Sequence, residues 1–439
     1  SFYHISTASI LTLVLASLSS SQGLTMGENK FSEQFAKLLS SLNEAQKDNV
    51  GRVSLYRDAE FFRQKVTVSE AGGNGFKITK QQAEELYKQI DDLESKLQLI
   101  PLHKLKKRNI LAKVYSVFRF TGVVCFMLHG GVFSIFLMVL EQFEKMIGVP
   151  RDYQLSCRIK SFMSWFFFAI CGLGCVVHNY VAVKRLDGPA LLMFNHQSNM
   201  DAFALPLTFP WQLKCVAKKE LFMVPFLGWL SIAFGAIPIN RKSRSQAIQA
   251  LEAAGAAVER HGDCMAISPE GTRSKTGLLM PFKKGPFYLM QALQMPLVPA
   301  LIYGSYETWP SKAKFCCMGQ IHVRYLDPLP PGALGPDRDA AAAALRRRML
   351  AALPDIPEGA GKPLTLRQWV DHIMATVALW SFAYIEAQYL KLALAKWGLN
   401  LFHGFVLMWV AALPVGITIY FLYVKVIYRQ GSAKPDGKQ

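Results

Sequence analysis

The sequence predicts an α/β domain built around one sheet, with membrane-associated helices on both sides of it along the chain. Between residues 180 and about 335, short apolar runs alternate with helical or loop stretches, which is the pattern of such a domain. Longer apolar runs flank this region. Of the 439 residues 51% are hydrophobic, but 18% are charged, so much of the chain must still face water.

The charge of the chain narrows the choice of partners. A formal net charge of +18 indicates nucleic acid, an anionic membrane surface or a phosphorylated substrate. The apolar composition favours the last two, and the sequence has no aromatic-basic RNA-binding motif or zinc finger. We therefore expect no nucleic-acid partner. The eight cysteines show no disulfide framework or paired C-x-x-C motif, which indicates reduced thiols in a cytosol-facing domain.

Two segments precede the apolar part of the chain. Residues 1–77 are predicted to be an extension that is partly disordered or carries a targeting signal: residues 1–26 are rich in Ser and Thr with a short apolar core at Ile10–Leu15, and the residues from 27 on are polar and weakly periodic. Residues 78–100 are predicted to form an amphipathic helix, because apolar residues alternate at spacings of three and four until Pro101. The apolar stripe at 83–100 fits a homodimer seam and packing within one chain equally well.

Residues 101–185 are predicted to form a membrane-associated helical hairpin. Its apolar runs are Gly122–Leu140 and Ser161–Val183, and the first is nearly long enough to span a bilayer. Basic residues precede the first run, and Lys184 and Arg185 follow the second, so both ends are expected in the cytoplasm. The alternative is two interfacial helices on one leaflet. Both arrangements place the following domain beside the membrane on its cytoplasmic side.

Residues 186–335 are predicted to form the α/β domain. The stretch SQAIQALEAAGAAVERHG (245–262) fits a helix, because it starts at a Ser cap and ends at a Gly. The candidate strands are short and apolar. They are Val181–Lys184, Leu191–Phe194, Leu213–Ala217, Ala236–Ile239, Cys264–Ile267, Leu297–Tyr303 and Ile321–Leu326.

The C-terminal part is predicted to return to the membrane. Residues 336–363 read as a helix followed by a Pro/Gly linker, and residues 364–439 as membrane helices and a tail. The block at 401–424 is a transmembrane candidate, whereas the block at 373–393 contains Glu386, which is costly in lipid. Because the tail is basic, we expect a helical hairpin with its charged face on protein and a cytoplasmic end.

The stretch NHQSNMD (195–201) carries the first candidate chemistry. On a regular helix five positions correspond to about 500°, so His196 and Asp201 would diverge by about 140°. A turn from a strand into a helix would instead bring them together. Asp201 can then accept a hydrogen bond from one imidazole nitrogen, which leaves the other free as a base. Such a pair alone is more often structural than catalytic.

Three further motifs follow NHQSNMD in order: GAIPINR (235–241), PEGTR (269–273) and MPLVPA (295–300). With these four motifs the chain resembles the glycerolipid acyltransferases, specifically the 1-acylglycerol-3-phosphate (lysophosphatidate) acyltransferase family. The resemblance covers about 175–330. Ser268 stands where the family usually has an aromatic residue, and Pro286 where it often has a small one, but neither change removes a catalytic group.

The resemblance implies a glycerolipid acyltransferase fold, with a single mixed sheet flanked by helices. It also implies acyl-CoA-dependent transfer of a fatty acyl group to the sn-2 hydroxyl of lysophosphatidate, which gives phosphatidic acid. A positioned base accelerates attack by an alcohol by about 10²–10⁴-fold, so we expect His196 to be the general base and Asp201 to orient it. The thioester is already activated and no G-x-S-x-G elbow occurs, so no covalent acyl-enzyme is expected.

Cationic residues are expected to bind the acceptor phosphate. Arg273 and Arg241 can supply fork-shaped contacts, and Lys218 a point charge. The resemblance implies phosphate binding for Arg273 and for a lysine of the pair 218–219. Lys283 and its neighbour Lys284 fit contacts to phosphates and a solvated patch equally well.

The remaining substrate-binding candidates lie in the PEGTR motif. Gly271 lets the backbone approach the ligand, and its N–H can help to stabilise an oxyanion. Glu270 is expected to order this loop and the acceptor rather than act as the base, and Thr272 belongs to the same motif. Residues 221–234 are expected to dip into the membrane and line an acyl-chain tunnel. The histidines lack ligand spacing, so we expect no metal, and no cofactor apart from acyl-CoA as co-substrate.

Other functions remain open at this stage. Glycerol-3-phosphate or a larger lysophospholipid, such as lysophosphatidylcholine, would be an alternative acceptor for the same chemistry. A non-catalytic lipid-binding or scaffold protein is a different class, but the intact His196 and Asp201 argue against it. A hydrolase or thioesterase would leave the cationic cluster without a purpose. The expected partners are lysophosphatidate, acyl-CoA and a lipid bilayer, and the expected location is the endoplasmic reticulum membrane with the catalytic domain facing the cytosol.

Overall fold

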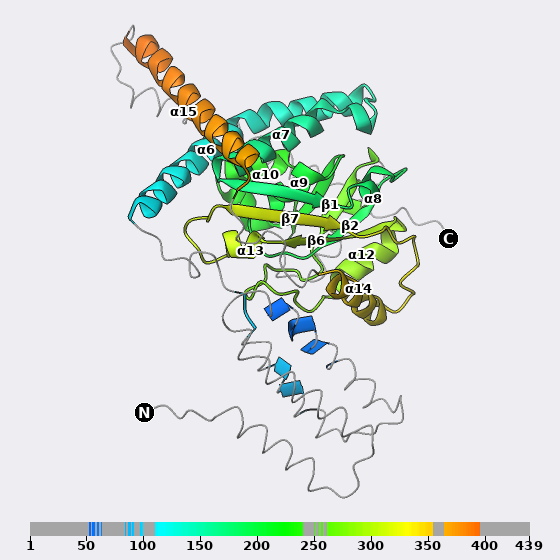
Figure 1. Cartoon of the computed structure of the whole chain (residues 1–439). Helices are drawn as coiled ribbons and strands as arrows, with labels where there is room; N and C mark the ends of the chain where they lie inside the picture. The colour runs from blue at the N-terminus through cyan, green and yellow to red at the C-terminus, as the bar shows by residue number, and fades with distance from the viewer. Residues whose placement is uncertain are drawn as a thin grey trace, which may run out of the picture.

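A seven-stranded sheet forms the centre of the computed structural model (Figure 1). The structure describes residues 110–239, 261–353 and 364–395, together with scattered residues within 52–63, 84–99 and 251–258. The strands are β1 (Leu173–His178), β2 (Leu191–Phe194), β3 (Leu213–Lys218), β4 (Ala236–Ile239), β5 (Cys264–Ile267), β6 (Leu297–Tyr303) and β7 (Gly319–Tyr325).

The sheet is mixed, which confirms the predicted fold class for the domain. Its strand order is β1-β7-β6-β2-β5-β3-β4. All neighbours pair in parallel except β6 and β7, which are antiparallel. The central strands β2 and β5 are buried along their whole length, because helices cover both faces of the sheet. This burial explains why they read as continuous apolar runs rather than as alternating ones.

Helices lie on both faces of the sheet (Figure 1). Those described are α6 (Ile110–Met146), α7 (Leu155–Ile170), α8 (Val181–Lys184), α9 (Asp201–Thr208), α10 (Leu227–Ala233), α12 (Gly285–Leu293), α13 (Ser305–Thr308), α14 (Arg338–Ala352) and α15 (Leu366–Ala395), with the 3-10 turns Arg151–Tyr153 and Lys219–Met223. Side chains of β2 alternate between the faces. Leu192 and Phe194 pack in the core under α6, α7 and α9, whereas Leu191 and Met193 pack in the core under α12 and α14.

Two predicted elements were wrong. Val181–Lys184 forms the short helix α8 and not a strand. The apolar run Ser161–Val183 is not one helix, because α7 ends at Ile170 and β1 then pairs with β7. Gly172 between them adopts φ +64°, a left-handed conformation that commonly ends helices. The second arm of the predicted hairpin is therefore partly a sheet strand, and the sheet begins before residue 186.

The first arm is a long helix, α6. Among the described residues α6 is the one helix long and apolar enough to cross a membrane, and most of its apolar stretch is not buried by the rest of the protein. Both parts of α6 bind the α/β domain. Arg119 Nη2 donates to the carbonyl oxygen of Cys316 at 3.1 Å, and Lys214 Nζ of β3 donates to Glu141 Oε1 at 2.5 Å.

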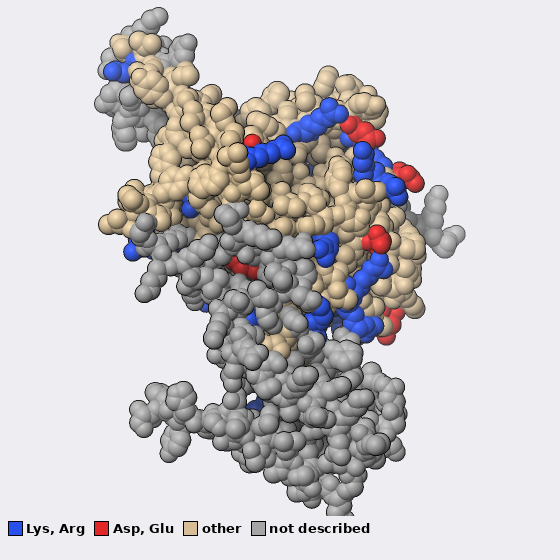
Figure 2. All heavy atoms as spheres, viewed as in Figure 1, with Lys and Arg blue, Asp and Glu red and all other residues tan. Residues whose placement is uncertain are grey.

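These two anchors fix the direction of α6. Positions 119 and 141 are about 33 Å apart at the rise of an α-helix, so the helix runs along the domain over this length. Its outward face is apolar. In the view of Figure 2 the surface of the helical layer is largely uncharged, apart from a row of Lys and Arg side chains that crosses it. The exposed residues of this face include Val114, Val117, Val124, Phe136, Val139, Phe143 and Met146.

The C-terminal block at 373–393 belongs to α15, which packs against α7 and α6. Glu386 Oε2 lies 2.6 Å from His129 Nε2 of α6, in agreement with the expectation that this charge faces protein. The predicted span at 401–424 and the tail lie outside the described residues. The same is true of most of the extension 1–77, of the stripe 83–100 and of the helix 245–262.

Candidate functional site

The imidazole of His196 and the carboxylate of Asp201 meet at the carboxyl end of β2. His196 lies in the turn after the strand, and Asp201 is the first residue of α9. The distance from His196 Nδ1 to Asp201 Oδ2 is 2.8 Å. The same oxygen accepts hydrogen bonds from the backbone N–H groups of Gln197 at 2.7 Å and Ser198 at 2.9 Å. The strand-to-helix turn thus brings the pair together as predicted.

This geometry leaves one nitrogen of His196 available. When Nδ1 donates its proton to Asp201, Nε2 carries the lone pair of the neutral imidazole. The Asp201 side chain is 1% exposed and that of His196 is 26% exposed. The carboxylate is therefore hidden from solvent, while the imidazole can reach a substrate. Such a pair can take a proton from a hydroxyl and hold the resulting imidazolium.

The turn at residues 195–201 is fixed by hydrogen bonds to residues that are distant in the sequence. The side chain of Asn195 donates to the carbonyl oxygen of Ile302 in β6 at 2.7 Å and accepts from its N–H at 2.6 Å. Ser198 Oγ donates to the carbonyl oxygen of Trp309 at 2.7 Å. Sequence reasoning missed both supports, because their partners lie more than 100 positions away and no local pattern marks them.

Glu270 binds the turn that carries His196 through its carboxyl group. Its Oε1 accepts the backbone N–H of His196 at 3.0 Å, and its Oε2 accepts that of Met280 at 3.3 Å. The residue is 1% exposed. Burial raises the pKa of Glu270 to about 8, although these N–H groups favour its ionised form. The side chain orders two loops, in agreement with the expected role, and is turned away from solvent.

The rest of the PEGTR loop lies beside the same turn. Arg273 Nη1 donates to Asn199 Oδ1 at 2.7 Å, so the guanidinium is close to the His196 turn. Gly271 has φ +69°, and a Cβ there would lie 3.0 Å from Cδ of Lys283. The side chain of Lys283 therefore lies against Gly271, which brings a second cation to the loop. Thr272 is exposed.

The other two residues predicted to bind phosphate, Lys218 and Arg241, are not observed beside His196. Lys218 ends β3, which runs parallel to β5 and so ends at the same edge of the sheet as β2. Its side chain is 58% exposed and its Nζ lies 3.6 Å from Glu220 Oε1. No contact in the described part of the chain joins it to His196. Arg241 lies outside the described residues.

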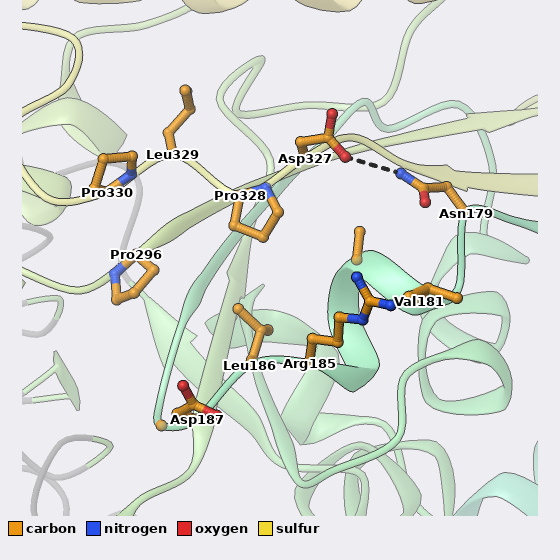
Figure 3. A pocket seen from close by; sticks show the side chains of 12 residues that line it. Asn179, Val181, Arg185, Leu186, Asp187, Pro296, Asp327, Pro328, Leu329 and Pro330 are labelled. Carbon is orange, nitrogen blue, oxygen red and sulfur yellow. Dashed lines mark hydrogen bonds between the residues drawn. The ribbon is translucent and has the colours of Figure 1, made fainter.

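A cavity of about 530 Å³ lies at the opposite edge of the sheet (Figure 3). Leu186 and Pro296, which line it, precede the first residues of β2 and β6. Across it, Asn179 Nδ2 donates to Asp327 Oδ1 at 3.3 Å. The cavity is thus separated from His196 by the length of β2. Among the residues that the structure describes, no group of three His, Cys, Asp or Glu side chains could hold a metal ion.

Comparisons with known proteins match the same part of the chain. The model of the family described as Acyltransferase matches residues 175–303. The 1-acyl-sn-glycerol-3-phosphate acyltransferase of Saccharomyces cerevisiae is 34% identical over 171 residues, which are 38% of this chain and 56% of the relative. The human beta form is 35% identical over 147 residues, 33% of this chain and 52% of the relative. The chain thus spans about half the length of these curated relatives.

Two further matches are longer. A putative 1-acyl-sn-glycerol-3-phosphate acyltransferase of Caenorhabditis elegans is 28% identical over 254 residues, which are 56% of this chain and 88% of the relative. Among solved structures, the 1-acyl-sn-glycerophosphate acyltransferase PlsC from Thermotoga maritima matches with a TM-score of 0.43 and 20% identity, over 54% of this chain and 95% of that chain.

Proposed function

This chain belongs to the acyltransferase family, and from that membership we propose that it transfers a fatty acyl group from acyl-CoA to the sn-2 hydroxyl of lysophosphatidate, giving phosphatidic acid. The observation that carries the proposal is the His196–Asp201 pair, joined at 2.8 Å, with the guanidinium of Arg273 held beside the same turn. The names of the curated relatives support the choice of acceptor.

In the proposed reaction His196 acts as a general base. Nε2 takes the proton of the acceptor hydroxyl while its oxygen attacks the thioester carbonyl. The tetrahedral intermediate then collapses, the C–S bond breaks, and the CoA thiolate leaves with the proton from the imidazolium. Asp201 stabilises that imidazolium and keeps the ring in one orientation. The acyl group passes directly to the acceptor oxygen, so the reaction needs no acyl-enzyme.

The acceptor would be held by its phosphate. Arg273 is bound to the neutral amide oxygen of Asn199, a partner that a phosphate can replace with a stronger, charge-assisted contact. Lys283, against Gly271, adds a second cation. Two cations suit the phosphate monoester of lysophosphatidate better than the phosphodiester of lysophosphatidylcholine, which carries one negative charge. Glycerol-3-phosphate shares the monoester and is the second candidate.

The membrane arrangement we propose is interfacial. The exposed apolar face of α6 supports it, because Arg119 and Glu141 of this helix both bind the domain and so hold the stretch between them along it. A helix in that position can rest its apolar side in the acyl boundary of one leaflet. The catalytic domain would then lie on the cytosolic surface of the endoplasmic reticulum, where both the lysolipid and acyl-CoA are accessible.

The test is an acceptor panel. The chain of residues 1–439 in vesicles is supplied with one labelled acyl-CoA and, separately, with lysophosphatidate, glycerol-3-phosphate, lysophosphatidylcholine or no acceptor. We expect labelled phosphatidic acid to be the main product. A higher kcat/KM with glycerol-3-phosphate would transfer the proposal to that acceptor. Release of free fatty acid without transfer would contradict it and indicate a thioesterase.

A further inference from the structure

Arg346 of α14 joins the N-terminal segment to the catalytic domain. Its guanidinium forms a bidentate ion pair with Glu60, in which Nη1 donates to Oε2 at 2.5 Å and Nη2 donates to Oε1 at 2.6 Å. Nη2 also donates to Tyr56 Oη at 2.6 Å. The side chains of Arg346 and Glu60 are 13% and 5% exposed. This bidentate ion pair is therefore nearly excluded from water. Its two parallel hydrogen bonds fix the orientation of the guanidinium relative to the carboxylate.

Arg346 also contacts the loop that follows the PEGTR motif. Nη2 donates to the carbonyl oxygen of Leu279 at 3.1 Å, and Nε to that of Met280 at 3.2 Å. The hydroxyl of Tyr56 donates to the same carbonyl oxygen of Leu279. Leu99, from further along the N-terminal part, donates its N–H to the carbonyl oxygen of Thr276 at 2.8 Å.

The loop that contains Met280 is linked to the turn that carries His196. Met280 donates its N–H to Glu270 at 3.3 Å, and the other oxygen of Glu270 accepts the N–H of His196 at 3.0 Å. A continuous series of hydrogen bonds thus runs from Glu60 through Arg346, Met280 and Glu270 to His196. It starts in a segment that precedes the residues 175–303 matched by the family model.

We infer that Tyr56 and Glu60, acting through Arg346, are positioning residues for His196, so that the N-terminal segment is part of the working active site. The inference rests on the proposed function. A buried ion pair adds little net stability compared with apolar side chains of similar size, but it fixes geometry. A shift of about 1 Å in a catalytic group can cost roughly 10²-fold in rate, so a fixed loop matters more for turnover than for folding.

The experiment uses variants of the chain of residues 1–439. Glu60→Gln weakens the ion pair, Tyr56→Phe removes the hydroxyl, and Arg346→Met removes the fork. The matched control is Arg348→Met, because Arg348 lies on the same helix, is exposed, and donates to the carbonyl oxygen of Asp327 at 3.1 Å. Each variant is assayed for kcat and KM, and for hydrogen exchange of the peptides that contain His196 and Met280.

We expect Arg346→Met to lower kcat about tenfold and to leave the KM for acyl-CoA within about twofold, because the base is displaced while the donor still binds. Exchange at the N–H groups of His196 and Met280 should become faster. Glu60→Gln and Tyr56→Phe should give smaller changes in the same direction. Glu60→Gln combined with Arg346→Met should be no worse than Arg346→Met alone, since both act through one contact.

Unchanged exchange at these two N–H groups in Arg346→Met would overturn the inference. Equal losses of kcat in Arg346→Met and Arg348→Met would overturn it as well, since a general effect on α14 would explain them. If the wild type transfers no acyl group to any acceptor, the proposed function fails. Hydrogen exchange still decides then whether the N-terminal segment holds the His196 turn.

Discussion

One carboxylate oxygen of Asp201 accepts hydrogen bonds from the imidazole of His196 and from two backbone N–H groups. The imidazole therefore has one favoured orientation and tautomer, and its reactive nitrogen is directed away from the carboxylate. Glu270 differs from Asp201 in its task. It is buried and accepts two backbone N–H groups, so it supports the turn.

Asp201→Asn tests the orienting carboxylate. The amide keeps the shape of the side chain, but it no longer carries the charge that stabilises the imidazolium. We expect kcat to fall by at least about 10²-fold, with the KM for acyl-CoA nearly unchanged. Steady-state kinetics with lysophosphatidate measure both. A variant that retains half of the wild-type kcat would show that Asp201 is only a structural partner.

Arg273→Ala tests the phosphate contact. Loss of a charge-assisted fork is expected to cost roughly 2–4 kcal/mol, so the KM for lysophosphatidate should rise by roughly 30- to 1,000-fold. Arg273→Lys keeps the charge without the fork and should lie between the wild type and Arg273→Ala. Equal increases in the KM values for acyl-CoA and lysophosphatidate would argue against a phosphate-binding role.

Glu307 gives a prediction about stability and pH. It is fully buried in α13, and burial raises its pKa from 4.5 to about 7. The folded state thus favours the protonated carboxyl, whose contribution is present below about pH 4.5 and is lost as the pH rises through 7. Relative to Glu307→Gln, the wild type should lose about 2–3 kcal/mol of unfolding free energy between pH 5 and pH 8. Parallel pH profiles of denaturant unfolding for the two proteins would contradict this.

At the scale of elements, the strands that line the site could be predicted from the sequence. The predicted bounds of β2, β4, β5 and β6 are those of the structure, because strands buried on both faces are short continuous apolar runs. The strand β1 was not predicted. Its apolar residues continue those of α7, and a short apolar run does not distinguish a strand from a buried helix.

The helix α6 was predicted as an apolar segment, but its direction relative to the α/β domain could not be predicted. Its buried polar residues, Arg119 and Glu141, decide that direction by binding to the domain. The sequence shows these residues as isolated charges at the two ends of an apolar run. Their partners come from other elements, so the spacing along the helix does not reveal them.

The exposed face of α6 can be tested with vesicles. Replacing Val117, Val139 and Phe143 by Ser removes apolar area from positions that are 51%, 63% and 50% exposed. Each loss is worth at most about 1.5–3 kcal/mol of burial in lipid, so we expect at least a tenfold weaker partition into vesicles by co-sedimentation. Circular dichroism should be unchanged. Unaltered partition in the folded variant would show that this face does not bind the membrane.

At the scale of the whole molecule, the turn that carries His196 lies at the sheet edge between two different layers. One layer contains α6 with its apolar outer face, and the other contains α14 with the N-terminal residues that contact Arg346 and the loop after the PEGTR motif (Figure 1). The His196–Asp201 pair and the PEGTR loop could be predicted because their motifs are local. The contact of Arg346 with Glu60 joins positions 286 residues apart, which no local pattern indicates.

The most direct test of the account is the rate of acyl transfer by His196→Ala. Wild type and variant are compared in the same vesicles with lysophosphatidate and labelled acyl-CoA, and acyl-CoA binding is measured in parallel. A general base contributes about 10²–10⁴-fold, so the variant should lose at least about 99% of the wild-type rate while it still binds acyl-CoA. A folded variant that keeps more than about a tenth of the wild-type rate would contradict the assignment of His196 as the base.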